Sequence, residues 1–105
     1  MEPASLERAL MEVAARAGVR VRCEPFDPRS FPDVDRRGGL CFVDGAALLL
    51  VDAALLPVER VAILTEALSL LELDAVPMPP AVRERLTLAG DRRADRRRRA
   101  IRQIK

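Results

Sequence analysis

The fold is decided by one stretch near the middle of the chain: Leu40-Cys41-Phe42-Val43-Asp44-Gly45-Ala46-Ala47-Leu48-Leu49-Leu50-Val51. Asp44-Gly45 favours the centre of a two-residue type I′ turn, because both positions of that turn need positive φ angles. Apolar residues flank the pair on each side, so the stretch predicts a β-hairpin with strands at 40–43 and 46–51. Both strands are apolar without alternation, which predicts that both of their faces are covered.

Upstream of the hairpin, the sequence predicts a helix and a third strand. Apolar residues recur at helical spacing over Leu6–Ala17. Val19–Cys23 then alternates with a period of two, which predicts a strand with its valines and Cys23 on the core face. A loop with three prolines follows at 24–37, and Gly38-Gly39 is interpreted as a turn of the chain.

Downstream, the pattern predicts three more helices. An apolar stripe at helical spacing predicts the first over Val58–Glu72. Residues 75–80 hold three prolines, so this segment is expected to be extended. A short helix from Pro80 to Leu88 is expected to close at Gly90, and a last helix is expected over Arg92–Ile104.

These elements predict an α+β fold: a small three-stranded sheet with a β-hairpin, packed by helices on one face, and C-terminal helices that include a basic tail. The chain of 105 residues is long enough for one domain. We divide it into a core at 1–90 and a tail at 91–105, because the charge is unevenly placed. The core carries a net charge of −4 and the tail +6.

The composition limits the chemistry of the chain. It contains no His, Trp or Tyr, and its two cysteines form no CxxC motif, so Cys23 and Cys41 are interpreted as buried apolar residues. The first residues have no basic and apolar regions like those of a signal peptide, and the uncharged stretch at 45–51 is too short to span a bilayer. We therefore expect a cytoplasmic protein of bacterial type that uses no cofactor, no metal and no membrane.

A helix-forming stretch after the hairpin is similar to a known metallopeptidase motif. It reads Val51-Asp52-Ala53-Ala54-Leu55-Leu56-Pro57-Val58-Glu59-Arg60-Val61-Ala62-Ile63-Leu64-Thr65-Glu66-Ala67-Leu68-Ser69-Leu70-Leu71. In ImmA/IrrE-type metallopeptidases, which are gluzincin-like, an arginine is followed by Ala-His-Glu-Leu-Gly-His-Leu. Arg60 and Glu66 match that pattern, whereas Thr65 and Ser69 stand where the two histidines would be. The order of elements over 5–72 is similar as well.

The resemblance implies a zincin-like core that has lost its HExxH histidines. Two imidazoles one helical turn apart bind the zinc ion in that motif, and the glutamate takes a proton from the metal-bound water. Hydroxyl groups are poor zinc ligands at neutral pH, so we expect no catalytic zinc and no catalytic residue. Glu66 is interpreted as a solvated acid on the helix face, and a residual hydrolase that uses Glu66 is the less favoured alternative.

Two functions from different classes follow. The preferred one is a non-catalytic scaffold or protein-interaction protein, not an enzyme, which forms a homodimer or binds another protein. Its interface is expected on the sheet face away from the helices or along the hairpin edge, with these residues: Phe42, Leu48, Leu49 and Leu50.

The alternative is a nucleic-acid-associated protein that binds weakly and without sequence specificity through its tail. The residues expected to contact phosphates are Arg92, Arg93, Arg96, Arg97, Arg98, Arg99, Arg102 and Lys105. A solvated terminus, or a tail that lies on the acidic core, explains the same charges.

Overall fold

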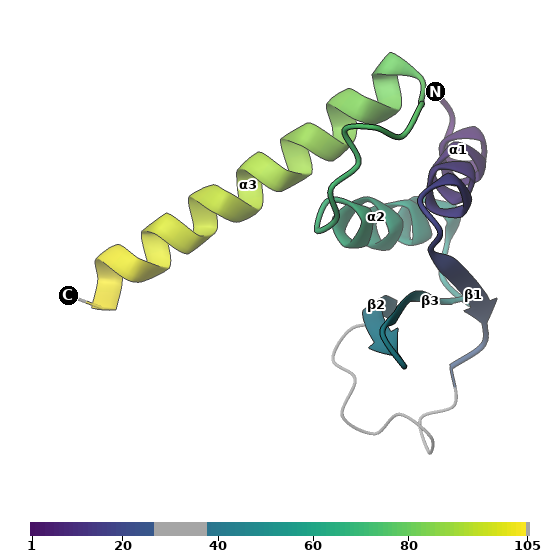
Figure 1. The fold of residues 1–105 in the computed structure, drawn as a ribbon, viewed down its shortest axis with the longest axis horizontal. Helices are drawn as coiled ribbons and strands as arrows, with labels where there is room; N and C mark the ends of the chain where they lie inside the picture. The colour runs from purple at the N-terminus through teal and green to yellow at the C-terminus, as the bar shows by residue number, and fades with distance from the viewer. Residues whose placement is uncertain (27–37, 105) are drawn as a thin grey trace.

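The computed structural model describes residues 1–26 and 38–104, with side chains for 1–26 and 38–100 (Figure 1). Its elements are α1 (Pro3–Arg16), β1 (Arg20–Glu24), β2 (Gly38–Val43), β3 (Ala46–Asp52), α2 (Pro57–Leu68) and α3 (Pro80–Ile104). The chain therefore has the α+β fold that the sequence predicts, with helices packed on a three-stranded mixed sheet.

The sheet has the strand order β1-β3-β2. β3 pairs in parallel with β1 and antiparallel with β2, so it lies in the centre with a partner on each side. Asp44 and Gly45 join β2 to β3 with φ angles of 52° and 80°, which confirms the predicted hairpin turn. The central position lets β3 form backbone hydrogen bonds along both of its edges.

The two faces of the sheet have different neighbours. α1 and α2 lie side by side on the same side of the sheet (Figure 1). Leu49 and Val51 are fully buried in the core beneath these helices. Because side chains alternate along a strand, Leu48 and Leu50 point to the opposite face, where both are only partly buried. Among the described elements, α3 contacts α1 and α2 but no strand.

An ion pair inside the helical layer connects α1 to the start of α2. Arg60 Nε donates to Glu7 Oε1 at 2.8 Å and Nη2 donates to Oε2 at 3.2 Å. Nη1 of Arg60 also donates to the carbonyl oxygen of Leu55, so the guanidinium holds the turn before α2. The hydrogen bond to Glu7 raises the pKa of Arg60. A raised pKa stabilises the fold at every pH below the unfolded value, so this contribution is lost only in strongly alkaline solution.

The C-terminal region forms one helix, where the sequence analysis predicted two. α3 continues through Gly90, so the prediction of a break there is wrong. A glycine inside a helix costs about 1 kcal/mol relative to alanine, which weakens a helix without ending it. Val82 and Leu86 are buried against the helical layer and hold the first half of α3 in place. The C-terminal end of α3 extends away from the other elements (Figure 1).

Three smaller predictions are also wrong. Cys23 is exposed, because burial on the inner face falls from Val19, just before β1, through Val21 to Cys23. Gly38 and Gly39 belong to β2 and do not form a turn. α2 ends at Leu68, four residues before the predicted end, and turns follow it.

Within the described residues, no helix combines the length and the apolar character needed to cross a membrane. The predicted loop at 24–37 lies outside the described residues from position 27 onward.

Candidate functional site

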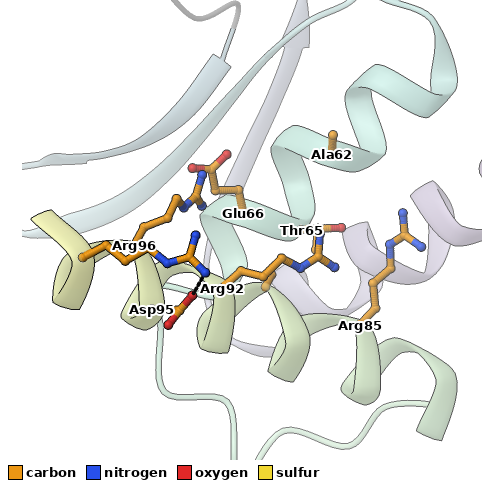
Figure 2. A pocket seen from close by; sticks show the side chains of 9 residues that line it. Ala62, Thr65, Glu66, Arg85, Arg92, Asp95 and Arg96 are labelled. Atoms are coloured by element: carbon orange, nitrogen blue, oxygen red, sulfur yellow. Dashed lines mark ion pairs between the residues drawn. The ribbon is translucent and has the colours of Figure 1, made fainter.

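A groove of about 600 Å³ lies between α2 and the middle of α3 (Figure 2). Two elements far apart in the sequence form its walls, and charged side chains from α3 dominate one of them. Its lining residues are Ala62, Thr65 and Glu66 from α2, and Arg85, Ala89, Arg92, Asp95, Arg96 and Arg99 from α3.

Four arginines form a stripe along the α3 wall, which we call the arginine stripe: Arg85, Arg92, Arg96 and Arg99. Their spacings of seven, four and three residues place them on one face of the helix. At 1.5 Å per residue the stripe spans about 21 Å of the helix axis. Like charges at such spacings destabilise an isolated helix by about 0.2–0.5 kcal/mol for each pair. One carboxylate of α3 offsets part of this repulsion, since Asp95 pairs with Arg99 at 3.0 Å.

The segment that carries the arginine stripe is nonetheless suited to a helix. Arginine and alanine have high helix propensity, and cations near the C-terminal end interact favourably with the helix dipole. Helix formation by residues 94–100 therefore depends on local preferences, since their side chains are all exposed.

Histidines occupy two positions of the metallopeptidase motif, and Thr65 and Ser69 stand at these positions one turn apart. Thr65 lies within α2, and Ser69 directly follows it. Thr65 is only 8% exposed, and its Oγ1 has no hydrogen-bond partner among the described residues. Ser69 follows the last residue of α2 and donates its hydroxyl to the Glu66 carbonyl oxygen at 2.7 Å. Arg93 binds the same serine, with Nη1 2.7 Å from Oγ and Nη2 2.8 Å from the carbonyl oxygen. Ser69 thus helps to attach α3 to the end of α2.

The structure divides the predicted tail arginines into three groups. Arg92, Arg96 and Arg99 line the groove, and Arg93 holds Ser69. Arg97 and Arg98 are exposed and do not line it. The side chains of Arg102 and Lys105 lie outside the described part of the chain.

Sequence reasoning missed Arg85, which belongs to the same stripe. It lies on the core side of the boundary that we drew between residues 90 and 91. The signal was nevertheless present, because Arg85 precedes Arg92 by seven residues, or about two helical turns. The expected break at Gly90 concealed this spacing.

The residues predicted for a protein interface do not all lie on one surface. Leu48 and Leu50 lie on the sheet face away from the helices, and Phe42 on the hairpin is 64% exposed. Leu49 is fully buried beneath the helices, so the prediction that it belongs to a surface is wrong. Register places further small or apolar side chains beside Leu48 and Leu50 on the outer face: Cys41, Val43 and Ala46.

The groove supplies guanidinium donors and carboxylate acceptors. Arginine side chains present several N–H donors in a planar arrangement that matches phosphate and carboxylate groups. Among the described residues, no three His, Cys, Asp or Glu side chains come together as a metal-binding group. The stripe thus presents planar donor groups of the kind that match phosphate and carboxylate oxygens.

Comparison of the chain with protein families, with characterised proteins and with solved structures finds no match.

Proposed function

We propose that this chain is a non-catalytic interaction protein that pairs with a second copy of itself through the outer face of its sheet. The outer face consists of the apolar side chains of Cys41, Val43, Ala46, Leu48 and Leu50, bordered by β1. The observation that supports the proposal is the placement of the helices. α1 and α2 pack on the opposite face, and α3 contacts no strand in the described chain.

The charges on β1 favour a second copy as the occupant of this face. Arg20, Arg22 and Glu24 share the outer side of the strand, and Arg22 pairs with Glu24 at 3.2 Å. A twofold axis that reverses the direction of this border brings Arg20 of each copy opposite Glu24 of the other, where the two charges attract. Burial of the apolar centre would also stabilise a domain of this size, because small domains bury a low fraction of their surface.

The proposal includes the loss of zinc chemistry that the resemblance implies. Its support is the arrangement around α2, where Thr65 and Ser69 supply hydroxyl groups in place of imidazoles. Ser69 is already bound by Arg93 and by the backbone of its own helix. In a non-catalytic protein α2 serves only to pack against its neighbours. The hydroxyl groups of Thr65 and Ser69 do not interfere with that packing.

Sedimentation velocity of the full chain at micromolar concentrations tests the self-association. We expect a dimer for the wild type and a folded monomer for Leu50→Asp, because this change places a charge in the apolar centre of the interface. Val58→Asp is the matched control, since Val58 is an exposed apolar residue of α2 on the other side of the sheet.

A wild type that stays monomeric throughout the concentration range would refute the proposal. It would be refuted equally if Val58→Asp dissociated the dimer as effectively as Leu50→Asp. Circular dichroism of each variant shows whether a loss of association reflects unfolding instead.

A further inference from the structure

The arginine stripe lies in a concave surface, and this position distinguishes it from an ordinary solvated basic helix. Arg92 and Arg96 lie on the α3 wall opposite α2, and Thr65 lies on the α2 wall (Figure 2). Thr65 contributes a nine-tenths-buried hydroxyl with no partner among the described residues. Four arginine side chains thus line the groove together with the carboxylates of Glu66 and Asp95, while the Thr65 hydroxyl lies buried in the α2 wall.

We propose that the groove between α2 and α3 binds the phosphodiester backbone of a single nucleic-acid strand without reading its sequence. The stripe spans about 21 Å, so it contacts several successive phosphates and exceeds the size of one phosphate group. The described lining includes no aromatic side chain, so bases do not stack in the groove and the backbone alone is held. α3 continues beyond Arg99, so a strand that follows the stripe can extend past the groove.

The concave shape favours a strand over an anionic membrane. A bilayer is flat and would contact the arginines on the outside of α3, such as Arg97 and Arg98, before it reached a groove between two helices. A single strand is narrow enough to enter. A single strand should therefore contact the arginines of the groove, and a membrane should contact those on the outside of α3. The two sets can be substituted separately.

The test measures the binding of a fluorescently labelled oligothymidylate to the full chain by anisotropy, as a function of salt. Four phosphate contacts, which include Arg99 once it exchanges Asp95 for a phosphate, predict a slope of log K against log salt of about −2.8. This slope is about a fiftyfold loss of affinity between 50 and 200 mM salt. The double variant Arg92→Gln/Arg96→Gln should lower the affinity at low salt by at least about tenfold and should reduce the slope to about −1.4.

The matched control is Arg97→Gln/Arg98→Gln, which removes the same charge from the same segment of α3 outside the groove. Its slope should stay near −2.8. Equal losses for the two double variants would overturn the groove as the site, because general attraction to a basic helix would then explain the binding. Absence of binding by the wild type at low salt would overturn the proposal as a whole.

A competition experiment checks the class of ligand. Polyglutamate of matched length and charge should displace the oligonucleotide poorly. Its carboxylates are not spaced along the chain as the phosphates of a nucleic-acid strand are. Displacement as effective as that by unlabelled oligothymidylate would instead identify the groove as a site for acidic peptides. Circular dichroism of both double variants confirms that α3 remains helical.

Discussion

The two faces of the sheet show how differently adjacent residues of one strand can behave. Leu49 is fully buried beneath α1 and α2, whereas its neighbour Leu50 points to the outer face and is only partly buried. The residue type is the same, so the sequence of β3 alone does not distinguish them. The position of the helices decides which leucine belongs to the core. The same comparison extends to Gly38 and Gly39 in β2, which also lie on opposite faces.

The largest expected effect comes from truncating the inner leucine. Leu49→Ala should lower the free energy of unfolding by about 2–5 kcal/mol, because it leaves a cavity in a fully buried site. Leu50→Ala should cost about 1 kcal/mol in dilute solution, since its side chain is partly in water. Urea denaturation of both variants measures the difference. Equal losses would mean that the outer face is covered as completely as the inner one.

Replacement of the two glycines sharpens the same comparison. A Cβ atom on Gly38 would lie 2.5 Å from the Leu50 carbonyl oxygen and 2.9 Å from Ile63 Cγ2. A Cβ atom on Gly39 would meet nothing within 4 Å of the described chain. The φ angles are 158° and 155°, so backbone strain is nearly the same for both and the difference isolates the steric clash.

Gly38→Ala should therefore be less stable than Gly39→Ala by about 1–3 kcal/mol, the usual cost of overpacking. Thermal unfolding followed by circular dichroism measures this difference. Similar midpoints for the two variants would show that β2 can shift relative to both β3 and α2 without loss of stability.

Much of the fold could be predicted from the sequence, because local signals and packing agree there. The Asp44-Gly45 turn, the first helix and the helix after the hairpin all have distinct patterns, and the structure contains all three. The strand order β1-β3-β2 has no local signal, since it depends on how distant segments pair. The exposure of Cys23 and the position of Gly38 within β2 have no local signal either. Both depend on how the strands pair and on which part of the sheet the helices cover.

The candidate site was predicted in part. The sequence indicated a basic tail, but it contains no local signal that separates the arginines of residues 91–105 into groups. The structure separates a structural arginine from those that line a groove, because Gly90 does not interrupt α3 and the whole helix keeps one register. The arginines of the groove can be recognised only when the helical spacing is followed through Gly90.

Arg93 and Arg97 contrast a structural arginine of α3 with an exposed one. Arg93 holds the end of α2 through two hydrogen bonds to Ser69, whereas Arg97 is exposed. Arg93→Ala should lower the free energy of unfolding by about 1–2 kcal/mol, because the loss includes hydrogen bonds from a charged donor. Arg97→Ala should change it by less than about 0.5 kcal/mol. Chemical denaturation would contradict this division if both variants were equally stable.

The smallest effect on stability is expected from removing residues 94–105. Side chains of 94–100 are exposed, and the buried contacts of α3 come from Val82 and Leu86 in its first half. The shortened chain should therefore unfold within about 0.5 kcal/mol of the full chain. Its affinity for the oligonucleotide should nevertheless fall, because Arg96 and Arg99 leave the groove. If stability persists while binding is lost, the second half of α3 contributes to ligand binding. A large loss of stability would instead show that the second half of α3 supports the core.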